Sequence, residues 1–407
     1  MTHDVNVLGN DDLAAAHNLF FGTLHFPPSD EEGAARGASF YEPGRALGIH
    51  DGGVLAATAM SFATSTVVPG GAVLPTAGVS RVGVRADKTR RGFLSAMMRA
   101  QLDDVAARGE ALASLRASEA RIYGRFGYGV ATRGRGVRVR SSGRGWRPTA
   151  PVGGTVRLLE RSEVIATLAE LHERVALQRA GQITRRREWW DKRFGRTIAE
   201  HKHLIAAVHT GTDGDDGYML ASVAEGTENF TERTVGIDEL NTGNVAATAG
   251  LWRFALGLDL IGTATASLRP LDEPLELLLA DPRDCAVTDI GDETWLRIVD
   301  VPTALAARSY GSGAEPVLIA VHDPMLEKNA GVYRISGDGA ERVGPLGGPI
   351  APELECDVAA LAMAYLGDRS PSELVATGWW SAIDRAAVAR ADALFATHVV
   401  PWCGTFF

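Results

Sequence analysis

The stretch VSRVGVRADKTRRGFLSAMM, residues 79–98, constrains the fold more than any other part of the chain. The apolar residues of Val79–Val84 predict a β-strand. Apolar residues then recur at helical spacing over Gly92–Arg108, which predicts a helix. The chain must therefore pass from a strand through a short basic loop into a helix.

A helix that begins after such a loop is a natural site for a phosphate group. Its first turn offers backbone N–H groups without intrahelical partners, and it carries the positive end of the helix dipole. A pyrophosphate binds well there. Arg90 and Arg91 add positive charge, and Gly92 permits close approach of the backbone. The loop has too few glycines for a Walker A or a G-x-G-x-x-G dinucleotide motif.

The order of the predicted elements divides the 407 residues into three segments, 1–148, 149–288 and 289–407. The first contains a predicted hairpin around the turn Asp51-Gly52-Gly53. The second repeats the strand–helix–strand order of residues 79–115, which suggests a divergent duplication. The third mixes helices with antiparallel strands, an α+β pattern, and the fold class expected for the whole chain is α+β (mixed α/β).

The connections between the segments are also predicted. Residues 133–136 are expected to be a strand end and residues 141–145 a linker, because both stretches are rich in glycine. Leu271–Gly291, with two prolines, is expected to be a tether.

Composition excludes several classes of protein. Hydrophobic residues make up 45% and charged residues 22%, as in ordinary globular chains. The net charge of −9 disfavours nucleic-acid binding and suits cationic partners. The three cysteines are far apart, and the histidines show no metal-binding spacing, so neither disulfides nor a metal site are expected. We see no signal peptide and no long apolar run, and therefore expect a cytoplasmic protein without a membrane span.

A second motif reads SEARIYGRFGYG, residues 118–129, and follows a predicted strand, Ala111–Leu115. Together with the loop Thr89–Leu94 it resembles the coenzyme A site of the Gcn5-related N-acetyltransferase (GNAT) superfamily. The chain most closely resembles the enhanced intracellular survival (Eis) family of that superfamily. The strings VLPTAGVS at 73–80, RRG at 90–92 and WLRIVDVPTAL at 295–305 extend the similarity over most of the chain.

The resemblance implies two tandem GNAT-like domains, the second degenerate, and a C-terminal sterol-carrier-protein-like domain. It implies acetyl-CoA as cosubstrate and no metal. The residues that it places around the cosubstrate are Val82, Gly83, Val84, Arg90, Arg91, Gly92, Phe93, Leu94, Ser95, Ser118 and Glu119. The second segment carries Asn241-Thr-Gly-Asn-Val-Ala where the RRG loop stands in the first, so we expect no coenzyme A there.

The chain ends PWCGTFF, which is unusually apolar for a terminus. Burying a terminal carboxylate is costly unless it is paired or used, so the tail is either a hydrophobic anchor or part of the active site. The resemblance favours the second alternative, with the Phe407 carboxylate as the base. It also assigns Tyr123 as the group that donates to the departing thiolate. Tyr128 is the rival, and we expect it to be a core tyrosine with a satisfied hydroxyl.

The same resemblance implies direct acetylation of amines of a polycationic, aminoglycoside-like molecule by a homo-hexamer. The residues that it places near the amine are His25, Phe26, Glu31, Arg81 and Phe406. Three of these depart from the family pattern. His25 and Phe406 stand where acidic residues are expected, and Arg81 replaces an aromatic residue, so the pocket is less acidic than in the family. Two alternatives stay open: a protein-lysine acetyltransferase, and a vestigial acetyltransferase that serves as a lipid-binding or ligand-binding scaffold.

Overall fold

The computed structural model describes residues 3–141, 145–201, 203–223 and 233–407. The chain forms two compact units, each assembled from separate parts of the sequence. Unit 1 contains residues 1–131, 294–397 and 406–407. Unit 2 contains residues 132–293 and 398–405. These units do not follow the three consecutive segments, and the boundaries at 148 and 288 stay a prediction.

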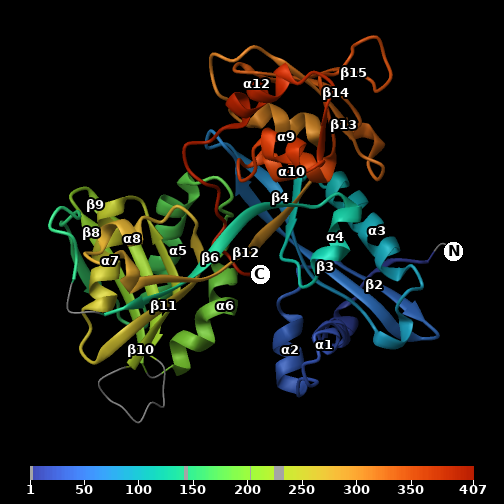
Figure 1. The fold of residues 1–407 in the computed structure, drawn as a ribbon. Helices are drawn as coiled ribbons and strands as arrows, with labels where there is room; N and C mark the ends of the chain where they lie inside the picture. The colour runs from blue at the N-terminus through green and yellow to red at the C-terminus, as the bar shows by residue number, and fades with distance from the viewer. Residues whose placement is uncertain (1–2, 142–144, 202, 224–232) are drawn as a thin grey trace. The chain divides into compact units, whose positions relative to one another are not determined.

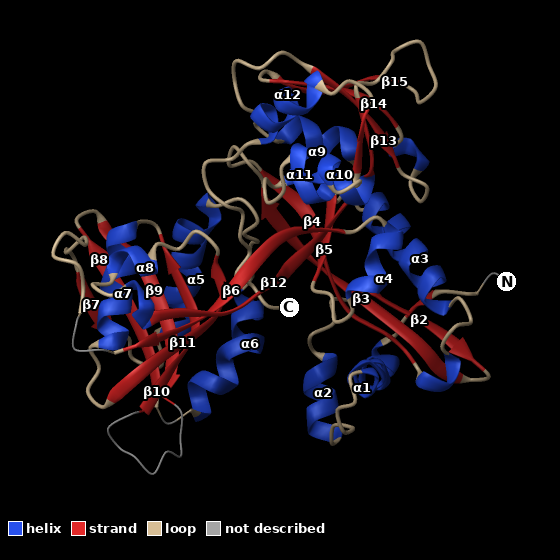
Figure 2. Cartoon of the chain, in the orientation of Figure 1, coloured by secondary structure: helices blue, strands red, loops and turns tan. Residues whose placement is uncertain are grey.

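The sheet at the centre of unit 1 is built mainly from the first segment (Figures 1 and 2). Its strand order is β1-β2-β3-β4-β5-β12, and only β4 and β5 run parallel. The strands are β1 (Asn6–Val7), β2 (Ala46–Asp51), β3 (Val54–Val67), β4 (Val73–Val84), β5 (Leu112–Leu115) and the last residues of β12 (Cys285–Ile298). The helices are α1 (Leu13–Thr23), α2 (Glu31–Ala38), α3 (Phe93–Ala107) and α4 (Ala120–Tyr123). The hairpin at 51–53 and the strand–loop–helix at 79–98 are both present.

Alternation of side chains along the strands separates two apolar layers on the two faces of this sheet. On one face, Val79 and Leu115 pack with Leu102 of α3 in a cluster that also contains Tyr123. On the other face, Phe62 packs with residues of α1. Figure 1 accordingly shows α1 and α3 on opposite sides of these strands.

The third segment forms a second sheet in unit 1, with strand order β15-β14-β13-β16-β17. Its strands are β13 (Val317–His322), β14 (Gly331–Ser336), β15 (Gly339–Gly344), β16 (Leu354–Asp357) and β17 (Trp380–Ala382). Its helices are α9 (Val301–Ala307), α10 (Val358–Tyr365), α11 (Pro371–Ala376) and α12 (Ala386–Phe395). Its core is continuous with that of the first segment, because Leu112 and Leu296 pack in one cluster with Leu305 and Leu361.

Unit 2 contains a sheet with strand order β6-β11-β10-β9-β8-β7. The strands are β6 (Gly129–Arg140), β7 (Thr155–Leu158), β8 (Leu204–Gly211), β9 (Gly214–Val223), β10 (Arg233–Thr242) and β11 (Ile261–Pro270). The helices are α5 (Val164–Val175), α6 (Arg187–Glu200), α7 (Val245–Leu256) and α8 (Leu275–Leu278). The parallel pair β10 and β11 joined by α7 repeats the arrangement of β4, α3 and β5.

One predicted connection is wrong. Leu271–Gly291 is not a tether, because it contains α8 and the start of β12. Residues 286–292 of that strand are all exposed, so they carry no apolar alternation that the sequence could show. The strand end expected at 133–136 lies inside the long strand β6, which continues to Arg140 and whose glycines are accommodated at close approaches to neighbouring chain segments. Of the linker expected at 141–145, residues 142–144 lie outside the described residues. Within the described ranges, no helix is long and apolar enough to cross a membrane.

Candidate active site

The parallel strands β4 and β5 part after three residue pairs. The pairs are Thr76–Leu112, Ala77–Ala113 and Gly78–Ser114, and β4 then continues to Val84 without β5 beside it. The edge of residues 79–84 that faces away from β3 therefore presents backbone donors and acceptors, as an added extended chain requires. Val82, Gly83 and Val84, predicted to contact the cosubstrate, all lie on this edge.

A β-bulge interrupts β4 within the same stretch. Thr58 pairs with Gly83, but Met60 pairs with Ser80, so β4 has an extra residue there. Arg81 adopts a φ of 52° in the bulge. This conformation is unfavourable for a residue with a side chain, and it redirects the guanidinium out of the regular alternation.

The Arg81 guanidinium packs on aromatic rings of the segment after α2 and is hydrogen-bonded to residues of α1 and α2. It lies 5.0 Å from the ring centre of Phe40 and 4.9 Å from that of Tyr41. It donates to Nδ1 of His17 at 2.9 Å and to the carbonyl of Gly37 at 3.0 Å. Burial and Arg81 lower the pKa of His17 to about 4, so this ring is neutral. The predicted role of Arg81 in substrate binding stays a prediction, and the structure shows it tying two helices to β4.

The N-terminus of α3 is open to a ligand. Gly92 precedes the helix with a φ of 88°, and among the described residues no side chain caps the first turn. Phe93 anchors this end, since it is buried and meets the ring of His3 at a centroid distance of 4.5 Å. Leu94 packs partly into the core, and Ser95 is exposed on the first turn.

The two loop arginines differ in their partners. Arg91 donates to Asp51 at 3.0 Å, and Lys88 donates to the same oxygen at 2.6 Å. Arg90 is exposed, with a φ of 63°, and makes no interaction within the described part of the chain. Of the two predicted phosphate ligands, Arg90 is thus the one with a free guanidinium.

Tyr123 and Tyr128 lie together beneath α3, with ring centroids 6.0 Å apart. Burial, and then the nearby carboxylate of Glu119, raise the pKa of Tyr123 to about 12. Ser118 and Glu119 themselves are exposed just before α4. The expectation that Tyr128 has a satisfied hydroxyl is wrong, because its hydroxyl is buried without a hydrogen-bond partner in the described residues. Its ring packs in the apolar cluster that contains Tyr123, and burial raises the pKa of this hydroxyl although the charge of Arg297 lies nearby.

The end of the chain reaches the opposite face of the unit 1 sheet. The Phe407 ring packs edge-on against Phe62, with centroids 5.3 Å apart. Phe406 is 57% exposed, and the guanidinium of Arg116 lies 5.3 Å from its ring centre. Arg116 was not predicted as a site residue. Its place directly after the strand that ends at Leu115 is the signal that could have revealed it.

The preceding tail residues are fixed within unit 2. The buried carboxylate of Glu293 accepts hydrogen bonds from the backbone N–H groups of Cys403 at 3.0 Å and Gly404 at 2.6 Å. Arg185 donates to the Thr405 hydroxyl at 2.9 Å. These are charge-assisted bonds in a buried setting, so residues 403–405 are held firmly.

The remaining predicted amine-site residues lie on the surface. His25 and Phe26 are exposed in the loop after α1, and His25 has a φ of 63°. Glu31 is the exposed first residue of α2. Its neighbour Asp30 caps this helix by accepting from the N–H of Gly33 at 2.8 Å.

The equivalent elements of unit 2 are arranged differently. The side chain of Asn244 caps α7 by accepting from the N–H of Ala247 at 2.8 Å, so this helix start already has a partner. Beyond the last β10–β11 pair, Arg269 donates to the carbonyl of Leu240 at 2.6 Å. The indole of Trp402 donates to the carbonyl of Leu268 at 2.7 Å. These groups fill the place that is open in unit 1, which supports the expectation that this half holds no coenzyme A.

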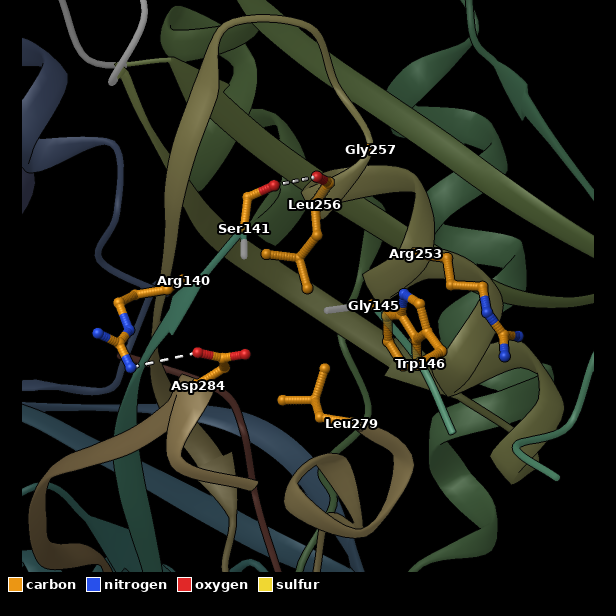
Figure 3. A pocket seen from close by; sticks show the side chains of 9 residues that line it. All are labelled: Arg140, Ser141, Gly145, Trp146, Arg253, Leu256, Gly257, Leu279 and Asp284. Atoms are coloured by element: carbon orange, nitrogen blue, oxygen red, sulfur yellow. Dashed lines mark hydrogen bonds and ion pairs between the residues drawn. The ribbon is translucent and has the colours of Figure 1, made fainter. Parts of the chain in front are cut away.

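Unit 2 also contains a cavity of about 130 Å³ that none of the predicted site residues lines (Figure 3). Trp146 stands beside Arg253, whose guanidinium lies 4.7 Å from the indole. Arg140 pairs with Asp284 at 3.2 Å, and the Ser141 hydroxyl donates to the carbonyl of Leu256. Arg140, Asp284 and Ser141 are thus already hydrogen-bonded, and Arg253 donates to the carbonyl of Pro151.

Comparison with known proteins places these features in context. The acetyltransferase (GNAT) domain family matches residues 4–131, a second GNAT family matches 181–298, and the sterol carrier protein domain family matches 301–404. An uncharacterised N-acetyltransferase of Streptomyces avermitilis is 34% identical over 99% of both chains. The N-acetyltransferase Eis of Mycobacterium tuberculosis is 34% identical over 82% of this chain and 81% of its own. The crystal structure of Eis1 from Mycobacterium abscessus superposes with a TM-score of 0.89 at 36% identity, covering 99% of this chain and all of that one.

Proposed function

Because the chain belongs to the Eis-type N-acetyltransferases, with two GNAT domains and a sterol-carrier-protein-like domain, we propose that it transfers acetyl directly from acetyl-CoA to an amine of a small molecule. The family membership confirms the predicted fold class and the predicted acetyltransferase activity. One observation carries the finer proposal. Beyond the pair Gly78–Ser114 the strands β4 and β5 part, and this opening joins the two faces of the sheet. Tyr123 lies on one face and Phe407 on the other.

The residues on the Tyr123 face suit coenzyme A. The uncapped start of α3 and the free guanidinium of Arg90 favour a pyrophosphate, and the unpaired edge of β4 favours the amide-bearing pantetheine arm. Bound acetyl-CoA supplies the acetyl thioester and a thiolate leaving group. The other groups needed for the reaction come from this chain.

Tyr123 is proposed to stabilise the departing thiolate by a hydrogen bond. Its pKa of about 12 lies above that of a thiol at about 8.5, so full proton transfer is uphill by about 5 kcal/mol. A phenol that keeps its proton is a good hydrogen-bond donor to a developing negative charge. Burial thus favours a role for Tyr123 as donor and not as acid.

The Phe407 carboxylate is proposed to accept a proton from the substrate ammonium. Its position at the end of a tail that packs on Phe62 supports this assignment. A carboxylate is a weak base for an ammonium, so part of its effect is electrostatic attraction of the cation.

The chemical class of the amine that accepts the acetyl group is the next part of the proposal. The acidic balance and the family resemblance favour an aminoglycoside-like polycation. Arg116 against Phe406 instead adds positive charge, and His25 stands where the resemblance leads us to expect an acidic residue. The competing functions are acetylation of lysine side chains in proteins and a ligand-binding scaffold without acetyltransferase activity. We also propose that the protein is a homo-hexamer and acts in the cytoplasm. Sedimentation velocity tests the hexamer.

An acetyl-transfer assay against an amine panel tests the function. The panel contains kanamycin, spermidine and a lysine peptide, and the wild type is compared with Tyr123→Phe and with a chain extended by one glycine after Phe407. We expect turnover with a small amine, intersecting initial-rate lines for a ternary complex, and large losses in both variants. Parallel lines would contradict direct transfer, and unchanged rates in both variants would remove the mechanism.

A further inference from the structure

The Ser114 hydroxyl lies at the last rung between β4 and β5. Ser114 is 1% exposed, and its oxygen has no hydrogen-bond partner among the described residues. Folded proteins rarely leave a buried hydroxyl unpaired, because it has lost its water without gaining another partner. An unpaired hydroxyl at the end of an opening in a sheet is therefore suited to bind a ligand.

The strand register fixes the face on which this hydroxyl lies. Phe62 pairs with Gly78, and Gly78 pairs with Ser114, so the three residues point to the same face of the sheet. A Cβ on Gly78 would lie 2.2 Å from the Phe62 ring, so that ring lies directly over the glycine. Phe407 packs against the same ring. Ser114 is thus on the face of the chain terminus and not on that of Tyr123.

We propose that Ser114 Oγ binds the acceptor amine, accepting a hydrogen bond from its N–H so that the nitrogen lone pair points at the thioester carbon. This inference rests on the proposed function. The amine gives one proton to the Phe407 carboxylate before attack. The C–N bond then forms, the C–S bond breaks, and the second amine proton passes to solvent while the thiolate leaves. Ser114 contributes no proton to the balance and acts by orientation.

The test compares Ser114→Ala with Ser61→Ala. Ser61 is also a buried serine, but it lies on β3 next to Phe62 and so on the opposite face, where it accepts from Arg45 at 3.4 Å. Three quantities are measured for each protein: the melting temperature, the dissociation constant of acetyl-CoA, and the binding of kanamycin and spermidine to the CoA-loaded protein by calorimetry. Acetyl-transfer kinetics are measured in parallel.

We expect Ser114→Ala to weaken amine binding and to lower kcat/KM for the amine about tenfold, as loss of one hydrogen bond does. Its melting temperature should stay the same or rise, because no internal bond is lost, and acetyl-CoA binding should not change. Ser61→Ala should leave amine binding unchanged.

Equal amine binding by Ser114→Ala and wild type would overturn the inference, as would a melting temperature lowered by several degrees, which would reveal a structural bond. Amine binding without turnover in the wild type would refute the proposed function alone, and Ser114 would then be judged by binding. If the wild type binds neither probe, both proposals fail.

Discussion

The ring of Phe407 meets the ring of Phe62 edge-on, with centroids 5.3 Å apart and planes at 85°. Phe62 itself lies over Gly78, on the last rung that joins β4 and β5. The final residue of the chain therefore lies beside the point where the first sheet opens. Such aromatic pairs are worth roughly 0.5–1.5 kcal/mol beyond the burial of their area, so this contact helps to position the end of the chain.

Extending the chain by one glycine should reduce kcat about 100-fold, because it displaces the carboxylate by roughly 3.5 Å and a positioned base contributes about that factor. Phe407→Ala keeps a terminal carboxylate and loses the ring contact, so its loss should be smaller, about tenfold. Steady-state rates at saturating acetyl-CoA measure both. Equal rates for the extended chain and the wild type would rule out a catalytic terminus.

Tyr123→Phe should lower kcat about 100-fold, since it removes one donor to a developing charge. Tyr128→Phe is the matched control, because its buried hydroxyl makes no bond in the described structure and its loss should leave the free energy of unfolding unchanged or higher. Rates and urea unfolding are measured for both. A larger rate loss in Tyr128→Phe than in Tyr123→Phe would reverse the assignment.

The strand, basic loop and helix of residues 79–98 could be predicted because each depends on local sequence. The apolar strand, the helical spacing after Gly92 and the motif around Tyr123 all lie within short windows. The structure places β4 and α3 within a few residues of the predicted bounds at the loop.

Features that depend on pairing over long distances could not be predicted. The bulge at Arg81 is defined by the pairing of β4 with β3. Arg91 donates to Asp51, which lies far away in the sequence at the β2–β3 turn. Nothing in the local sequence singles out Ser114, because its proposed role depends on its position in the last pair between β4 and β5. The exposed half of β12 lacked the apolar alternation by which strands are recognised.

Asp323→Asn should destabilise the protein by about 3–5 kcal/mol. Arg297 and Asp323 are both fully buried, and one guanidinium nitrogen lies 2.7 Å from each carboxylate oxygen, so the substitution leaves a buried charge without its counterion. Glu32→Gln is the control, since its pair with Arg36 is exposed and should contribute less than about 0.5 kcal/mol. Urea unfolding at neutral pH measures both. A change below 1 kcal/mol for Asp323→Asn would show that water compensates Arg297.

Stability should fall as the pH decreases from about 6.5 towards 4, in part because of His17. Its pKa is about 4 in the folded chain and near 6.5 when unfolded, so in this window the unfolded state binds more protons. Above pH 6.5 the ring is neutral in both states and contributes no pH dependence. His17→Gln should flatten the curve of melting temperature against pH in this window. The same slope in the variant would assign the acid sensitivity to other groups.

Acetyl-CoA should bind with a stoichiometry of one per chain, because the helix start is open at Gly92 but capped by Asn244 in the second GNAT domain. Arg90→Gln should weaken binding about tenfold or more, as loss of a charge-assisted contact does. Arg91→Gln should weaken it less, since Asp51 already holds that guanidinium. Asn244→Ala should cost about 1 kcal/mol of stability through the lost cap and leave binding unchanged. Calorimetric titration of the four proteins measures stoichiometry and affinity together. Two equivalents bound per chain, or a larger loss in Arg91→Gln than in Arg90→Gln, would contradict this account of the phosphate site.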